Sequence, residues 1–102
     1  MTPQEVYDTV RDHLLTQNAR SMNNAVCVYR SPNGLKCAIG CLIRDDEYFP
    51  EMEGEYIMNL GINRFYDHEF LLDDLRELHD IHDPSEWKRM LIGIAYDHGL
   101  DP

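Results

Sequence analysis

Two amphipathic helix patterns fill the last third of this 102-residue chain, and a helix-start signal stands between them. From residue 69 to residue 82, the spacing of the apolar side chains predicts a helix with one buried face. That face would carry Leu71, Leu75, Leu78 and His82. Asp83 can cap a second helix, Pro84 suits its first position, and Glu86 completes an acidic capping box. The inner face of this second helix would hold Trp87, Leu91, Ile94, Ala95 and His98.

A third helix is predicted at the N-terminus. Thr2 and Glu5 form a capping box, and Pro3 fits the first helical position. An apolar face then follows at helical spacing, and the pattern fades near residues 18–20. The face consists of Val6, Val10, Leu14 and Leu15.

A short hairpin is expected between the N-terminal helix and the middle of the chain. Residues 25–29 are β-branched and aromatic, which favours a strand, and the polar residues 20–24 before them are expected to form a loop. Residues 31–34 read Ser-Pro-Asn-Gly, a turn sequence. The second arm of the hairpin would then lie near residues 35–36.

Residues 37–43 are apolar on every side, and their pattern leaves both a buried strand and a buried helix open. We favour a helix, because Ala38, Cys41 and Leu42 would share one face and no β-branched run occurs. Gly40 within this segment predicts the close approach of another backbone.

Together these segments predict a mainly helical α+β fold, a single domain over residues 1–102. Three or four helices would pack around a buried central segment, beside a small β-hairpin. An acidic loop over 44–55 would separate the central segment from a short helix over 56–60 that Gly61 closes. The chain has no apolar run long enough for a transmembrane helix, and its acidic start is unlike a secretory signal. We therefore expect a cytoplasmic protein without membrane contact, and free thiols at Cys27, Cys37 and Cys41.

The stretch Leu35-Lys36-Cys37-Ala38-Ile39-Gly40-Cys41-Leu42-Ile43 resembles a family of small phage and prophage proteins that carry a K-C-A-I/V-G-C-L-I motif. The resemblance continues through Tyr48, through residues 51–54 and through residues 78–83 before Trp87, so it covers most of the chain. The motif carries no known chemistry that could be transferred to these residues. What it implies is origin: an accessory protein of a phage or mobile element, of the kind that blunts host defence in the bacterial cytoplasm by sequestering a nucleotide signal or blocking an effector.

Charge is divided unevenly along the chain. Residues 1–44 carry five basic and three acidic groups, whereas residues 45–102 carry four basic and sixteen acidic groups, for a total of -10. Folding of the predicted hairpin would gather cations and amides from the first half, and arginine binds phosphate well. A helix starting near Lys36 would add its positive end. The candidate ligand-binding residues are Arg20, Ser21, Asn23, Tyr29, Arg30, Lys36, Tyr48, His79 and His82.

This cluster leads to the first functional hypothesis, a non-catalytic binding protein that sequesters a small anionic, nucleotide-derived ligand. The plainer alternative is that these cations pair with the acidic second half and only hold the fold together. A second hypothesis is a protein–protein inhibitor of a host defence complex, in which the acidic half imitates nucleic acid. Its acids are Asp45, Asp46, Glu47, Glu51, Glu53, Glu55, Asp73, Asp74 and Glu77. Acidic runs also serve simply as a solvated face.

Catalysis and metal binding are weaker readings of the same residues. The cysteines lack the C-x₂-C spacing of structural zinc, and apolar neighbours around Cys37 and Cys41 favour core packing. The pair His79 and His82, each followed by an aspartate, leaves a small His/Asp hydrolase open as a third hypothesis. We expect no cofactor, no metal and no direct contact with nucleic acid, which the negative charge would repel. A homo-oligomer is expected from the small size.

Overall fold

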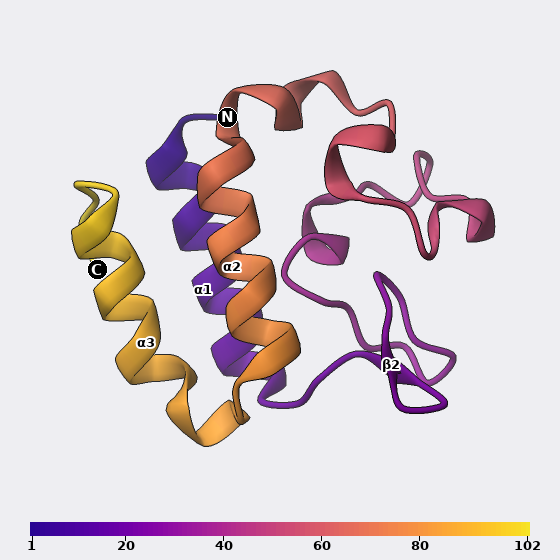
Figure 1. Ribbon diagram of the computed structural model, residues 1–102, viewed down its shortest axis with the longest axis horizontal. Coiled ribbons are helices and arrows are strands. Elements are labelled where there is room, and N and C mark those ends of the chain that lie inside the picture. The colour runs from indigo at the N-terminus through magenta and orange to yellow at the C-terminus, as the bar shows by residue number, and fades with distance from the viewer.

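Three helices stand side by side at one end of the molecule (Figure 1). The computed structural model describes all residues from Met1 to Pro102. Helix α1 spans Pro3–Gln17, α2 spans Glu69–Ile81 and α3 spans Pro84–Asp97, so the three helices predicted from the sequence are confirmed. Each of these helices packs against the other two. None of them is both long and apolar enough to cross a membrane.

The helix ends follow the capping residues. At α1, Thr2 Oγ1 accepts the Glu5 amide at 3.1 Å, and the Glu5 carboxylate accepts the Thr2 amide at 2.9 Å, which completes the predicted box. At α3, the Asp83 carboxylate accepts the Ser85 amide at 2.9 Å. The predicted second half of that box is missing, because the Glu86 side chain pairs instead with Arg89 at 3.4 Å.

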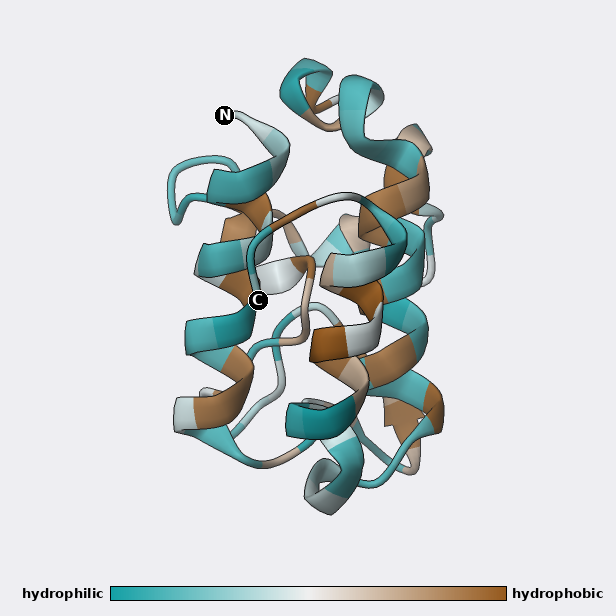
Figure 2. Ribbon diagram, turned by 90° about the vertical axis from the view of Figure 1, so that its left-hand side faces the viewer, coloured by the Kyte–Doolittle hydropathy of each residue, from teal (hydrophilic) through white to brown (hydrophobic).

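The core is one cluster of 20 buried apolar residues between the helices and the central segment. The helices in Figure 2 alternate apolar and polar bands, as amphipathic helices do. Val6, Val10 and Leu14 of α1 face inward as predicted, whereas Leu15 remains exposed. The Tyr7 hydroxyl, also in the core, donates to the Leu91 carbonyl at 2.9 Å and so joins α1 to α3.

The prediction of a helix over 37–43 is wrong. The segment is buried, as expected of a central segment, but it holds only one 3-10 turn, η1, over Gly40–Leu42. Its start is tied to the neighbouring strand region instead, since the Cys37 amide donates to the Tyr29 carbonyl at 3.1 Å. The expected backbone approach at Gly40 is confirmed: a Cβ there would lie 1.9 Å from the Tyr29 carbonyl oxygen.

The β-hairpin forms earlier in the chain than predicted. Strand β1, Met22–Asn23, pairs antiparallel with β2, Val26–Cys27, within the stretch expected to begin as a loop. Asn24 and Ala25 make the turn with positive φ angles of 52° and 67°, the conformation of a tight type I′ hairpin. The predicted arm near residues 35–36 survives as a single bridge between Arg30 and Lys36.

Residues 44–68 wrap the other end of the molecule in loops and short 3-10 helices (Figure 1). These are η2 over Pro50–Met52, η3 over Ile57–Asn59 and η4 over Asn63–His68. The short helix expected over 56–60 is therefore confirmed as η3, and Gly61 follows it with a φ of 75°.

Candidate functional site

A cavity of about 330 Å³ lies between the end of the hairpin, the acidic loop and α2. Its volume falls at the lower end of the range for small-ligand sites. Tyr29 and Tyr56 contribute aromatic rings, and Arg76 and Asp80 reach it from α2. The lining residues are Cys27, Val28, Tyr29, Cys37, Glu53, Gly54, Glu55, Tyr56, Ile57, Arg76 and Asp80.

The lining of this cavity contains three acidic side chains and one basic side chain, and they differ in whether they have a partner within the protein. The Arg76 guanidinium is held by its own helix, at 3.0 Å from Asp73 and 3.4 Å from Asp80. Glu53 accepts the backbone amides of Tyr29 at 2.8 Å and Arg30 at 3.1 Å. The carboxylate of Glu55, in contrast, makes no hydrogen bond or ion pair, so the one charge without a partner in the lining is negative.

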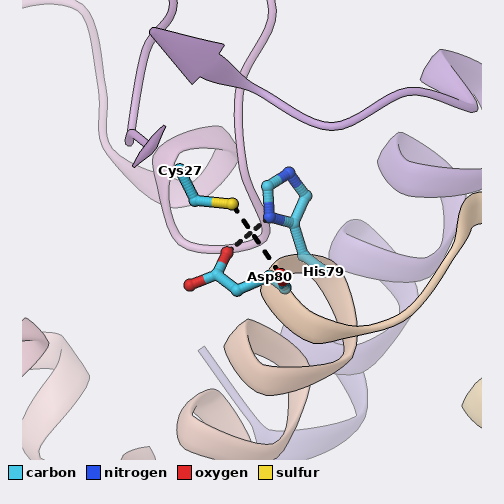
Figure 3. A group of neighbouring side chains, drawn as sticks. All are labelled: Cys27, His79 and Asp80. Carbon is cyan, nitrogen blue, oxygen red and sulfur yellow. Dashed lines mark hydrogen bonds and ion pairs between the residues drawn. The ribbon is translucent and has the colours of Figure 1, made fainter. Parts of the chain in front are cut away.

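Three potentially reactive side chains meet beside the cavity: Cys27, His79 and Asp80 (Figure 3). Their sulfur, ring-nitrogen and carboxylate atoms lie within 4.8 Å of one another. His79 is fully buried, its Nε2 accepts the Ser21 amide at 3.0 Å, and its Nδ1 lies 2.6 Å from the Asp80 carboxylate. Because an amide can only donate, Nε2 carries the lone pair and Nδ1 carries the proton.

This arrangement leaves His79 unable to act as a base toward Cys27 or as a metal ligand. Both nitrogens are already occupied, and binding a metal at Nδ1 while Nε2 accepts an amide would require an imidazolate. The Cys27 thiol points at the Asp80 carbonyl oxygen, 3.9 Å away, and burial together with the nearby Asp80 carboxylate raises its pKa to about 11. A thiol with so high a pKa is a poor nucleophile at neutral pH. Cys27 and His79 are therefore structural in this geometry.

The predicted ligand-binding residues separate into two groups. The first group surrounds Arg30, whose guanidinium lies 4.6 Å from the Tyr48 ring centre and 2.9 Å from Asp45. Lys36 shares that carboxylate at 3.8 Å. Arg30 also donates to the Ile43 carbonyl at 2.8 Å, while its Nε is buried without a partner. No helix begins at Lys36, so the expected positive helix end is absent from this group.

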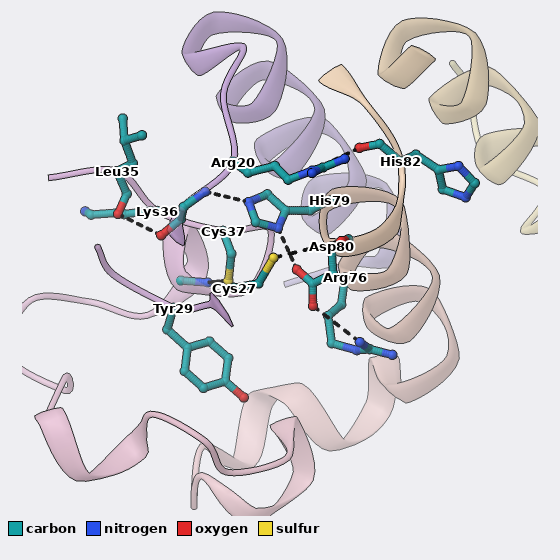
Figure 4. A network of polar contacts seen from close by, with 12 residues as sticks. Arg20, Cys27, Tyr29, Leu35, Lys36, Cys37, Arg76, His79, Asp80 and His82 are labelled. Atoms are coloured by element: carbon teal, nitrogen blue, oxygen red, sulfur yellow. Dashed lines mark hydrogen bonds and ion pairs between the residues drawn. The ribbon is translucent and has the colours of Figure 1, made fainter. Parts of the chain in front are cut away.

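The second group lies at the C-terminal end of α2 (Figure 4). Arg20 donates to the His82 carbonyl at 3.3 Å, and Trp87 Nε1 donates to the same oxygen at 3.0 Å. Ser21 Oγ donates to the Leu35 carbonyl at 3.2 Å and its amide to His79. These contacts join the hairpin to the α2–α3 connection.

The remaining predicted residues lie elsewhere. Tyr29 lines the cavity, where its hydroxyl donates to the Glu55 carbonyl, and burial raises the pKa of Tyr29. Asn23 lies in β1 with an exposed side chain. The geometry thus brings Arg30, Lys36 and Tyr48 together but leaves Arg20 with a different set of partners.

In the acidic loop, defined as residues 44–55, some carboxylates bond to other groups of the protein and others have no partner. Glu47 makes two 2.6 Å contacts with Arg64, and these hydrogen bonds lower its pKa to about 2. Glu53 accepts the Tyr48 hydroxyl at 2.7 Å in addition to the two amides named above. Asp46 reaches only Arg44, at 3.6 Å with both side chains exposed, and Glu51 has no ion pair. The free carboxylates of the loop are therefore those of Glu51 and Glu55.

Sequence reasoning did not assign the cavity residues Tyr56 and Arg76 to any site. It counted Glu53 only among the acids of the second half and Asp80 only as the aspartate that follows His79. Arg76 and Asp80 stand four residues apart on a predicted helix, which places both on one side of it. That spacing was a usable signal for this pair. Glu53 and Tyr56 lie in an irregular loop, where no periodicity indicates which way a side chain points.

A second, more open hollow shares Glu55 with the cavity, and its lining residues are Phe49, Glu51, Met52, Glu55, Asn59 and Leu60. Phe49 is 59% exposed and Tyr56 is 45% exposed. Exposed aromatic and acidic side chains therefore lie in the same stretch of chain, residues 49–56.

In comparisons with known proteins, no family model, no curated protein and no solved structure matches this chain.

Proposed function

We propose that this protein is a non-catalytic binding module that docks the acidic loop and its neighbours against a basic surface of a partner protein. In the setting that the phage resemblance implies, such docking would block a site where a host defence protein binds an anionic ligand. The docking surface comprises the acidic loop, residues 44–55, together with Tyr56. The observation that carries this proposal is the way the chain uses its charges.

Most lysine and arginine side chains of the protein form ion pairs with its own carboxylates. Seven of the nine lysines and arginines form ion pairs within the chain, and only Arg20 and Lys88 do not. Because nineteen acids compete for these seven cations, many carboxylates are left facing solvent. The net field outside the molecule is therefore negative and attracts basic partners.

Exposed aromatic rings add apolar contact surface to the negatively charged docking surface. Protein interfaces are enriched in tyrosine, phenylalanine and methionine at their centres, with charged groups around them. Phe49 and Tyr56 are exposed here, and Met52 lines the second hollow between them. A basic partner segment with apolar side chains would match both features. Phe70 and Tyr96 are exposed as well and lie outside this surface, so the combination of rings with free carboxylates, not the exposure of the rings alone, favours this end of the molecule.

The alternative of capturing a small anionic ligand ranks second. Arg30 and Lys36 do lie together, and the buried Arg30 Nε has no partner. An anion would, however, have to displace Asp45 from both cations, and Arg20, which donates to the His82 carbonyl, would not take part. A titration with ADP-ribose and with cyclic dinucleotides at low salt tests this alternative directly.

Binding of a fluorescently labelled peptide of alternating arginine and leucine tests the main proposal. We expect the variant Asp46→Asn/Glu51→Gln to weaken binding about threefold to tenfold, since exposed charge contacts contribute about 0.2–1 kcal/mol each. The matched control is Asp97→Asn/Asp101→Asn, which removes the same charge from the α3 end of the molecule (Figure 1). If both variants lost the same affinity for the peptide, the loss would reflect net charge alone, and this result would contradict a localised docking surface.

Ionic strength provides a second arm of this experiment. Screening shortens the reach of surface charges from about 30 Å at 0.01 M salt to about 8 Å at 0.15 M. The affinity of the wild-type protein should therefore fall steeply with salt, and that of Asp46→Asn/Glu51→Gln less steeply. An affinity that salt leaves unchanged would count against electrostatic docking.

A further inference from the structure

The cavity beside the acidic loop has the chemistry of a receptor for a positively charged side chain. We infer that it accepts the guanidinium or ammonium group of an arginine or lysine from the basic partner. This inference rests on the proposed function and adds to it a specific anchoring point. It is carried by three features of the lining: the sign of its free charge, the state of Arg76 and the position of the tyrosines.

The free charge of the lining is negative. Glu53, Glu55 and Asp80 line the cavity with Arg76 as the one cationic residue among them, and no lysine takes part in the lining. Glu53 is occupied by backbone amides, and Asp80 by His79 and Arg76. The exposed Glu55 carboxylate alone lacks a partner, and Glu55 lines both the cavity and the second hollow, so a cation entering from that side would find an ion-pair partner without breaking an existing contact.

Arg76 does not convert the cavity into an anion site. Its Nε and one terminal nitrogen donate to Asp73, at 3.2 and 3.0 Å, and its other terminal nitrogen donates to Asp80 at 3.4 Å. An entering phosphate or carboxylate would have to compete with two carboxylates for this guanidinium, and it would meet the negative charge of Glu55 as well. Anionic ligands are disfavoured on both counts.

The tyrosines provide the surface that an alkyl cation needs. Tyr29 is buried in the wall, and Tyr56 is half exposed at the mouth, next to Ile57. Aromatic faces attract arginine and lysine cations, and the methylene groups of those side chains pack on apolar surface. Figure 4 shows Tyr29, Cys27 and Arg76 close together on this part of the wall.

The test uses blocked amino acids as probes: N-acetyl-arginine methylamide and N-acetyl-lysine methylamide, with the neutral citrulline and norleucine analogues as controls. Binding is followed by NMR shifts of the backbone amides of Cys27, Tyr29, Gly54 and Tyr56 in the intact protein. We expect the cationic probes to shift these amides and the neutral probes to leave them unchanged. Glu55→Gln should weaken the cationic probes about fivefold, because it removes the free carboxylate but no internal contact.

Glu77→Gln serves as the matched control, since Glu77 is exposed on α2 and does not line the cavity. It should leave the probe affinity unchanged. Equal shifts from citrulline and arginine, or an unaltered affinity in Glu55→Gln, would overturn the inference. Spermidine forms a further arm: if it shifts the same amides far more strongly than either blocked amino acid, the source of the cation is a free polyamine rather than a partner side chain, and the inference fails in that respect.

Failure of this inference is distinguishable from failure of the proposed function. A basic peptide that loses affinity in Asp46→Asn/Glu51→Gln but not in Glu55→Gln would retain the docking surface and remove the cavity as its anchor. Conversely, cationic probes that bind the cavity while the peptide ignores the acidic loop would retain the cavity and remove the docking surface.

Discussion

The substitution Gly40→Ala tests the tightest contact in the molecule. The new methyl group would lie 1.9 Å from the Tyr29 carbonyl oxygen and 2.8 Å from its carbonyl carbon. An ordinary contact between such atoms needs a separation near 3.4 Å, so one backbone would have to retreat by about 1.5 Å. Both atoms belong to the main chain, and no side-chain rotation can relieve the clash.

The surroundings of Tyr29 resist that retreat. Its amide donates to Glu53, its carbonyl accepts the Cys37 amide, and its hydroxyl donates to the Glu55 carbonyl. Overpacking a core costs about 1–3 kcal/mol, and a lost internal hydrogen bond adds about 0.5–1.5 kcal/mol. We therefore expect Gly40→Ala to lower the free energy of unfolding by about 3 kcal/mol, which for a domain of this size lowers Tm by at least about 12 °C.

Gly93→Ala is the internal control for this experiment. Gly93 lies inside α3, and a Cβ there would meet nothing within 4 Å. The same chemical change should therefore stabilise the protein by about 0.5–1 kcal/mol through helix propensity and raise Tm by about 4 °C. Thermal unfolding followed by circular dichroism measures both. A Gly40→Ala variant as stable as the wild type would refute the packing described for the central segment.

Three further predictions concern single residues. The Arg64 guanidinium holds the pKa of Glu47 at about 2, below its ordinary value of 4.5, so the stabilisation from this ion pair is complete above about pH 4.5 and is lost as the pH falls toward 2. Glu47→Gln should lower the free energy of unfolding by about 1.5–3 kcal/mol at neutral pH. In urea unfolding at a series of pH values, the same variant should lose less stability between pH 4.5 and pH 2 than the wild type does. Ala25→Gly should raise the free energy of unfolding by about 1 kcal/mol in the same assay, because Ala25 adopts a positive φ of 67° and an exposed turn gains nothing from its methyl group; a loss of stability would contradict the assigned turn. The Cys27 thiol, with a pKa of about 11, should react with iodoacetamide at pH 7.5 far more slowly in the folded protein than after unfolding in urea, and a folded-state rate equal to that of an unfolded thiol would argue for an activated cysteine.

The features best predicted from the sequence are those that depend on the chemistry of a single residue and its immediate neighbours. The caps at Thr2 and Asp83 and the close approach at Gly40 were predicted correctly, because each follows from backbone chemistry within a few residues. The segment 37–43 was not, because a fully buried stretch has no polar face from which its period can be read. Its conformation is decided by Tyr29, whose carbonyl accepts the Cys37 amide.

The candidate site was harder to predict, because its contacts join distant parts of the chain. His79 was treated as one of a pair with His82, yet it is buried against Trp87 and bonds to Ser21, 58 residues away. Glu53 looked like one of many acids, although it fastens two amides and a tyrosine hydroxyl. A composition-level view of charge could identify the negative half of the molecule but not which carboxylates remain free.

The most direct test of the docking proposal is an NMR footprint of the arginine–leucine peptide on the isotopically labelled protein. We expect the amide shifts to concentrate in residues 44–56 and in the part of α2 around Arg76, while α3 keeps its free-state spectrum. Shifts centred on α3, or distributed evenly over every exposed acid, would contradict it.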